Sequence, residues 1–200
     1  LLKYLNETNI EKPTQIIRSD IDSVNSFKPS FSIDERTRSY LKVQDGCDYT
    51  CSFCTIPLAR GQSRSGTISS TIKAAKEIVK FGNKEIVLTG VNIGDFGKKN
   101  NESFIDLIYE LDRVSQINRI RISSIEPNLL TDEIIEFCNS SKKFMPHFHI
   151  PLQSGSNKIL RAMRRRYDKE VYKNRIKKIK DTNQDTCIGV DVIVGFPGES

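Results

Sequence analysis

Three cysteines, Cys47, Cys51 and Cys54, lie within a run of eight residues. Thiolate sulfur is a soft ligand that suits iron–sulfur clusters and also suits zinc. A [4Fe–4S] cube normally takes four cysteines, so three without a fourth nearby predict an iron with one position open to another ligand. The alternative is a structural zinc site, which usually has four protein ligands. His147 or Cys138 would then supply the fourth from a distant part of the sequence.

A second group of candidate residues follows the predicted strands. Turn-forming or polar sequence directly follows four apolar segments, at residues 89–92, 123–127, 151–155 and 195–199. Because the carboxyl ends of parallel strands meet at one face, these four loops predict a common cavity. We expect Gln153 to contribute to it, since in an extended chain Gln153 shares a face with His147 and His149. Each of those histidines is either a packed core residue or has a direct role in the site.

The densest positive charge lies between Arg161 and Lys180. Within this stretch Arg164, Arg165, Arg166 and Tyr167 are candidate contacts to RNA. Arginines pair with phosphates, and a tyrosine can stack on an unpaired base. The alternative is a solvated helix face, because the apolar residues that follow give the next helix a buried stripe of its own. The net charge of +6 permits a polyanionic partner but does not require one.

Apolar periodicity predicts strands that alternate with helices. The strands are expected at residues 40–44, 85–89, 119–124, 148–150 and 188–194. The first long helix is expected to be capped by Ser69 or Ser70, and a later one by Thr131. Cys138 falls on the apolar face of that later helix, which favours a place in the core. Repeated β–α units imply a parallel sheet with right-handed crossovers, hence an α/β barrel or partial barrel.

The composition is that of a soluble globular domain. The 200 residues are 37% hydrophobic and 28% charged. No apolar run approaches the roughly 20 residues of a membrane span, so we expect no membrane partner. Five cysteines, three of them too close together for a disulfide framework, indicate a reducing, cytoplasmic setting. We expect residues 1–38 to be the tail of a preceding domain and a linker, and residues 39–200 to be a core domain truncated at its carboxyl end.

The spacing C-x3-C-x2-C, with the aromatic Phe53 before its last cysteine, resembles the signature of the radical S-adenosylmethionine (SAM) enzymes. The resemblance implies an α/β fold, the radical SAM partial (β/α)6 barrel, here with about five βα units. It also implies a [4Fe–4S] cluster on Cys47, Cys51 and Cys54. The open iron of that cluster binds SAM, which an electron splits into methionine and a 5′-deoxyadenosyl radical. No side chain is expected to be catalytic in its own right, because the radical chemistry belongs to the cofactor.

The same resemblance implies where SAM would lie. Gly90 resembles the glycine of the methionine-binding turn, where the backbone approaches its ligand closely. Asp191 and Gly195 resemble the GxIxG strand near the adenine, with Asp191 in place of the first glycine. Phe53 and Gln153 complete the expected cofactor-binding set. Asp191 also has a structural alternative, as a hydrogen-bond acceptor that needs a partner because it lies between valines.

Four separated blocks of sequence, at residues 42–47, 56–61, 149–156 and 194–199, resemble blocks that follow one another in the same order in the methylthiotransferases. These enzymes insert a methylthio group into a C–H bond of tRNA or of a ribosomal protein. Residues 88–95, 123–127 and 163–167 resemble the branch that acts on carbon 2 of threonylcarbamoyl adenosine next to the anticodon. The resemblance implies tRNA and an electron donor as partners. The alternatives are isopentenyl adenosine, a ribosomal-protein side chain, or, outside enzymes, an RNA-binding module with a structural metal.

Members of that family also carry a preceding domain with a second [4Fe–4S] cluster and end in a small RNA-binding β-barrel. We expect neither within these 200 residues. The chain is therefore expected to bind one cluster and to cleave SAM, but not to complete sulfur insertion.

Overall fold

A computed structural model of the chain describes residues 20–32 and 37–199. Its strands are β1 (Ser30–Phe31), β2 (Arg38–Lys42), β3 (Gln44–Asp45), β4 (Arg64–Ser65), β5 (Glu85–Thr89), β6 (Arg119–Ile122), β7 (His147–His149) and β8 (Cys187–Gly189). Its helices are α2 (Ile56–Arg60), α3 (Ile68–Lys80), α4 (Phe104–Asp112), α5 (Asp132–Ser140), α6 (Asn157–Ala162) and α7 (Lys169–Thr182). Two short 3-10 turns are η1 (Ile21–Ser23) and η2 (Ile93–Asp95).

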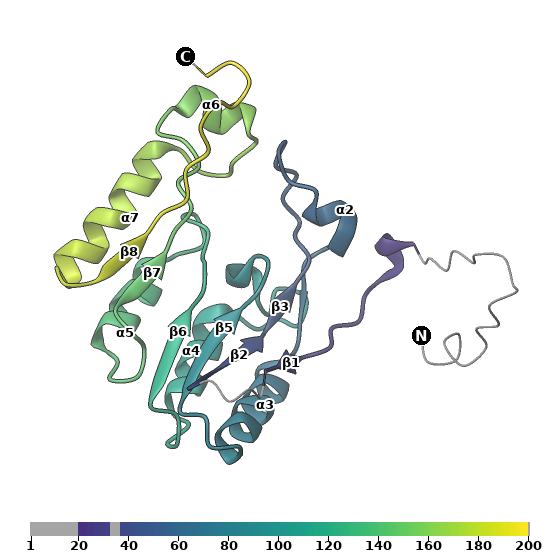
Figure 1. Cartoon of the computed structure of the whole chain (residues 1–200), viewed down its shortest axis with the longest axis vertical. Coiled ribbons are helices and arrows are strands. Elements are labelled where there is room, and N and C mark those ends of the chain that lie inside the picture. The colour runs from purple at the N-terminus through teal and green to yellow at the C-terminus, as the bar shows by residue number, and fades with distance from the viewer. Residues whose placement is uncertain (1–19, 33–36, 200) are drawn as a thin grey trace, which may run out of the picture.

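The framework of the described residues is a curved row of parallel strands (Figure 1). Strands β2, β5 and β6 pair in parallel, and β7 pairs in parallel with β8. An isolated bridge between Ile120 and Phe144, with a hydrogen bond of 3.0 Å from the Ile125 N–H to the His149 carbonyl, joins the two groups. Helices α3, α4, α5 and α7 lie along the outside of the row. The predicted α/β partial barrel is confirmed.

Strand β1 adds an antiparallel edge, with Phe31 opposite Leu41. It lies inside the segment 1–38 that the sequence favoured as a linker, and the predictions for residues 1–19 and 33–36 lie outside the described residues. In the part of the chain that the structure describes, no helix combines the length and apolar character needed to cross a bilayer.

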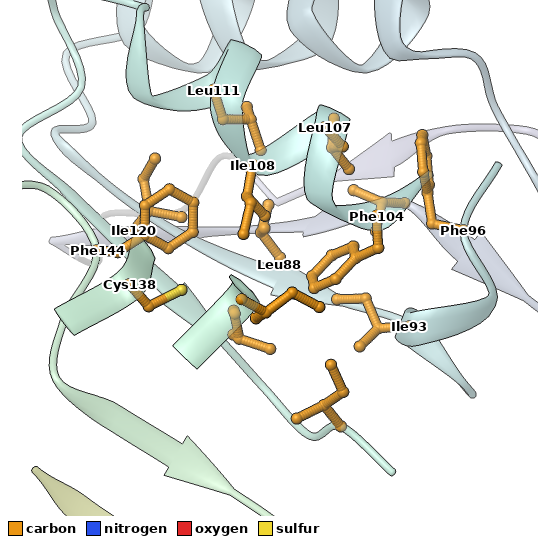
Figure 2. Packing of buried hydrophobic residues seen from close by; sticks show 14 of the residues in the cluster. Leu88, Ile93, Phe96, Phe104, Leu107, Ile108, Leu111, Ile120, Cys138 and Phe144 are labelled. Atoms are coloured by element: carbon orange, nitrogen blue, oxygen red, sulfur yellow. The ribbon is translucent and has the colours of Figure 1, made fainter. Parts of the chain in front are cut away.

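The hydrophobic core lies between the strands and helices α4 and α5 (Figure 2). Leu107, Ile108 and Leu111 of α4 are fully buried against the sheet. Each such side chain stabilises the fold by about 1.5–3 kcal/mol relative to exposure to water. Cys138 of α5 is 1% exposed and lies beside Phe144, so its predicted place in the core is confirmed.

Side-chain caps mark where helices α3 and α5 begin. Thr131 accepts a hydrogen bond from the backbone N–H of Ile134, which confirms its predicted role. The predicted cap of α3 is wrong, because Thr67 and not Ser69 or Ser70 occupies that position. Thr67 has an extended backbone and accepts from the Ser70 N–H at 3.1 Å. A cap must stand outside the helical turn that it satisfies, and Ser69 and Ser70 already lie within the first turn.

Two of the predicted strand ends, both close to the cysteine loop, are wrong. Strand β2 ends at Lys42, since Gln44 and Asp45 turn away to pair with β4. Strand β6 ends at Ile122, and Ser123 donates its N–H to the Leu88 carbonyl at 3.1 Å as the chain leaves the ladder. The prediction for β5 is confirmed at both ends.

The last predicted strand, at 188–194, is wrong over most of its length, since β8 ends at Gly189. Its partner β7 spans residues 147–149, one residue earlier than predicted. Beyond it Pro151 has no N–H to donate, and Gln153 has a φ of +63°. An isolated bridge between Gln153 and Val192 and backbone hydrogen bonds such as that from the Leu152 N–H to the Asp191 carbonyl at 3.1 Å continue the pairing, but not as a regular ladder. Alternating apolar residues predicted a strand here, but a ladder also needs an extended partner.

Candidate metal centre

The cysteine loop follows β3 at the carboxyl end of β2 and leads into α2. Cys51 is buried, at 8% exposed, and Cys47 and Cys54 are half-buried. The backbone N–H of Cys47 donates to the Gly61 carbonyl at 3.0 Å, and that of Cys54 donates to the Cys51 carbonyl at 3.1 Å. The first bond joins the start of the loop to the residue after α2, and the second closes a turn within the triad.

The three cysteines fit a cluster better than a single ion. Among residues 20–32 and 37–199, no three His, Cys, Asp or Glu side chains are grouped so that they could hold one metal ion. A zinc site requires that grouping, and its two candidate fourth ligands are Cys138 in the core and His147 on β7. A [4Fe–4S] cube binds each cysteine through a different iron, so the sulfurs need not converge on one point. Three soft donors without a fourth therefore fit a cluster with one open iron.

The environment of Cys47 disfavours a free thiolate. Burial raises the pKa of the Cys47 thiol to about 11, although a hydrogen bond from the Tyr49 N–H opposes that rise. Cluster binding must therefore displace a proton at neutral pH, which makes iron affinity depend on pH. A hollow of about 480 Å³ lies beside this residue, lined also by Asp48, Pro57 and Gln62.

Gln44 joins the cysteine loop to the turn after β5, a role that the sequence analysis missed. Its fully buried amide donates to the Gly46 carbonyl at 2.7 Å and to Ser63 Oγ at 2.9 Å. Its Oε1 accepts from the Asn92 N–H at 2.7 Å. A buried amide at the end of a strand could have been a sequence signal, but it would not have identified Asn92, which lies 48 residues away.

Gly90 lies between these two segments. A Cβ added at Gly90 would stand 3.0 Å from Gln44 Oε1 and 3.1 Å from Gln44 Cβ. The glycine therefore allows the close approach of Gln44 as well as any approach of a ligand. Its predicted contact with the methionine part of SAM stays a prediction.

Three other predicted SAM contacts lie after β7 and β8. The Gln153 N–H donates to the Asp191 carbonyl at 2.9 Å, so these two residues are neighbours. Asp191 Oδ1 lies 3.2 Å from His149 Nε2, and His149 Nδ1 contacts Ser124 Oγ. The partner that the Asp191 carboxylate was expected to need is thus His149, although 64% of the Asp191 side chain is exposed. Gly195 has a φ of +76° and lies further along the same segment.

The turn between α6 and α7 reaches across to the cysteine loop. Arg165 Nη1 donates to Cys51 Sγ at 3.2 Å, and its Nη2 forms an ion pair with Glu126. Burial alone would lower the pKa of Arg165, but the hydrogen bond and charge of Glu126 outweigh burial and raise that pKa. Its guanidinium also lies 6.0 Å from the ring centre of Phe53, which is 39% exposed. The structure therefore brings Phe53 and Arg165 together at Cys51.

The other residues of this turn differ in exposure. Tyr167 is 7% exposed and donates to the Pro151 carbonyl at 2.7 Å. Burial raises the pKa of Tyr167 to about 12, opposed by Arg165. The Arg166 guanidinium lies 4.2 Å from the centre of the Tyr49 ring and donates to the Asp48 carbonyl at 3.1 Å, and both Arg164 and Arg166 are exposed residues. A ring as buried as that of Tyr167 has no face open to a base. Tyr167 and the paired Arg165 are therefore unsuited to contact RNA, and Arg164 and Arg166 remain as the predicted RNA contacts.

The backbone arrangement defines the class of fold. The radical SAM methyltransferase TsrM from Kitasatospora setae superimposes with a TM-score of 0.66 at 15% identity, over 82% of this chain and 31% of that one. The FeFe-hydrogenase maturase HydG from Carboxydothermus hydrogenoformans does so with a TM-score of 0.50 at 20% identity, over 78% of this chain and 35% of that one. Identities this low establish the fold alone, and that fold is the one radical SAM enzymes share.

The model of the Radical SAM superfamily matches residues 41–200. The chain belongs to the radical SAM superfamily, and the resemblance of its cysteine motif is confirmed. Membership implies a [4Fe–4S] cluster and SAM as cofactors.

Named relatives indicate which members of the superfamily the chain resembles in sequence. The threonylcarbamoyladenosine tRNA methylthiotransferase MtaB of Bacillus subtilis is 48% identical over 174 residues, which is 86% of this chain and 38% of the relative. Its namesake in Thermotoga maritima is 37% identical over 100% of this chain and 46% of its own length. A tRNA-2-methylthio-N(6)-dimethylallyladenosine synthase of Rickettsia akari is 35% identical, over 90% of this chain and 42% of its own length. The resemblance to methylthiotransferases is confirmed, and the chain spans less than half the length of these relatives.

Proposed function

We propose that this chain is the radical SAM core of an enzyme that methylthiolates carbon 2 of threonylcarbamoyl adenosine in tRNA. The observation that carries the proposal is the loop of Cys47, Cys51 and Cys54, which places three cysteine ligands at the carboxyl end of the strands, whereas Cys138, a candidate fourth ligand of a zinc site, is buried in the core. Two of the relatives, identical at 48% and 37%, carry the name of that activity.

Some of these residues would bind the cluster, and others would position SAM or the loops around it. Cys47, Cys51 and Cys54 would hold the cluster, which together with SAM supplies hydrogen-atom abstraction from an unactivated C–H bond. Phe53 lies within the cysteine loop and Gly90 lies on the turn after β5 that Gln44 joins to this loop, and both are proposed contacts to SAM. The neighbouring segments at 153 and 191–195 are proposed to contact its adenosyl part. Gln44 fixes the distance between the cysteine loop and the Gly90 turn through its two buried hydrogen bonds.

A second candidate substrate is isopentenyl adenosine in tRNA. It is favoured by the relative of 35% identity that is named a dimethylallyladenosine synthase. Residues 88–95 and 123–127 resemble the threonylcarbamoyl branch instead, so we place that substrate first.

The whole protein's further parts belong to the same proposal. A second [4Fe–4S] cluster in a preceding domain would handle the inserted sulfur, and an electron donor would reduce the cluster on Cys51. Because tRNA is the proposed substrate, we place the protein in the cytoplasm.

Anaerobic reconstitution with iron and sulfide tests the cofactor chemistry. We expect the chain to gain broad visible absorption and, with dithionite and SAM, to release 5′-deoxyadenosine. Cys51→Ala should abolish both, and Cys187→Ala, at an exposed cysteine outside the loop, should change neither. Tight stoichiometric zinc with no cleavage of SAM would overturn the proposal in favour of a structural metal.

The substrate is tested in cells that lack the gene for the protein. Mass spectrometry of tRNA nucleosides should show threonylcarbamoyl adenosine without its methylthio group, and normal isopentenyl derivatives. Loss of the methylthio group from isopentenyl adenosine instead would assign the second substrate.

A further inference from the structure

The turn between α6 and α7 is fastened to the cysteine loop through backbone groups. The Ser52 N–H donates to the Met163 carbonyl at 3.2 Å, and Ser52 Oγ donates to the Ala162 carbonyl at 3.0 Å. These segments lie 110 residues apart in the sequence, so the contact is a feature of the folded chain. This contact places Arg165, two residues after Met163, directly against Cys51.

Arg165 is held there from several sides. Its side chain is 4% exposed, which is unusual for arginine unless the charge is paired. Glu126 supplies that charge partner on one side, and the Cys51 sulfur accepts from Nη1 on the other. The Tyr167 ring lies with its centre 5.0 Å from the guanidinium carbon. An unrestrained arginine side chain loses much conformational entropy when it adopts a single geometry. These contacts already hold the Arg165 side chain in one geometry.

A buried cation on a ligand sulfur has a defined effect on redox chemistry. The reduced form of an iron–sulfur cluster carries one more negative charge than the oxidised form. A positive group that donates a hydrogen bond to a ligand sulfur therefore stabilises the reduced form more, and hydrogen bonds to the sulfurs are a recognised determinant of potential. Glu126 acts in the opposite direction, because its carboxylate disfavours the added electron.

We propose that Arg165 is a positioning residue that orients Cys51 and raises the reduction potential of the cluster bound there, and that Glu126 limits this rise. The inference rests on the proposed function only in requiring a cluster on Cys51. The pair Arg165–Glu126 thereby sets how readily a donor can pass one electron to the cluster.

The test is a redox titration of the reconstituted chain without SAM, with dithionite as reductant and electron paramagnetic resonance as readout. For Arg165→Met we expect the ratio of reduced to oxidised cluster at a fixed potential to fall about tenfold, equal to a shift of about 59 mV to more negative values for a one-electron couple. Arg165→Lys keeps the charge but cannot span Cys51 and Glu126, so it should shift part of the way. Glu126→Gln should shift the potential in the opposite direction.

Arg161→Met is the matched control, because it removes the charge of an exposed arginine in the last turn of α6 and should leave the potential unchanged. Iron content and circular dichroism establish that each variant is folded and loaded. Equal potentials in wild type, Arg165→Met and Arg165→Lys would overturn the inference, as would a negative shift in Glu126→Gln. A wild-type chain that binds no cluster would overturn the proposed function itself, which is a separate outcome.

Discussion

Gly46 precedes the first cysteine and has a φ of +71°, a conformation that residues with a Cβ rarely adopt. A Cβ at this position would also collide with the carbonyl oxygen of Gln62. We therefore expect Gly46→Ala to destabilise the fold by roughly 2–6 kcal/mol, the sum of backbone strain and overpacking. Urea unfolding measures this cost. Because the loop must move to relieve the collision, iron loading after reconstitution should fall as well.

Gly155→Ala is the control for this prediction. Gly155 has ordinary backbone geometry, and a Cβ there would meet no atom within 4 Å. Its stability should match that of the wild type. If both substitutions had equal effects, the requirement for glycine at Gly46 would not come from the contact with Gln62.

The residue scale also shows what sequence could and could not predict about the site. The triad of Cys47, Cys51 and Cys54 was predictable because its chemistry depends on spacing within one short loop. Arg165 was placed among RNA contacts, because arginines in a basic stretch are suited to pair with phosphates. Its actual position depends on Glu126, which lies 39 residues away and meets it only in the folded chain.

At the scale of the element, the start of α3 gives a stability prediction. Thr67 accepts from the Ser70 N–H, so Thr67→Ala leaves that donor without its cap. The expected loss is about 1 kcal/mol, typical of removing a side-chain cap. Ser69→Ala should cost far less, since Ser69 is exposed within the first turn and alanine is a good helix former. Thermal or urea unfolding of the two variants separates them, and a larger loss in Ser69→Ala would refute the assignment of the cap.

Strands show why element ends were harder to predict than element types. The strand β5 was predicted at both ends because its run of apolar residues is bounded by Lys84 and Gly90. The segment around Val192 is also rich in apolar residues and hydrogen-bonds to residues 150–153, but Gln153 there adopts a positive φ, so no regular ladder forms. Side-chain pattern describes one strand at a time, whereas a ladder depends on two.

At the scale of the whole molecule, the basic stretch divides into two parts. Arg175 and Lys178 of α7 form ion pairs with Asp132 and Glu136 of α5, so part of this charge serves helix packing. Such surface pairs contribute little to stability, about 0–1 kcal/mol each. The exposed Arg164 lies outside these pairs and next to the cysteine loop, where it is suited to contact a polyanion.

Arg164 therefore carries the prediction for tRNA binding. If its guanidinium contacts one phosphate, Arg164→Met should weaken binding and lower the slope of log affinity against log salt by about 0.7–0.9. Lys84→Met removes the same charge from an exposed residue just before β5, at the opposite end of the strands, and should leave the slope unchanged. Fluorescence anisotropy with labelled tRNA over a series of KCl concentrations gives both slopes. Equal changes in the two variants would show that tRNA senses net charge alone, whereas a change confined to Arg164→Met places the RNA backbone beside the cysteine loop.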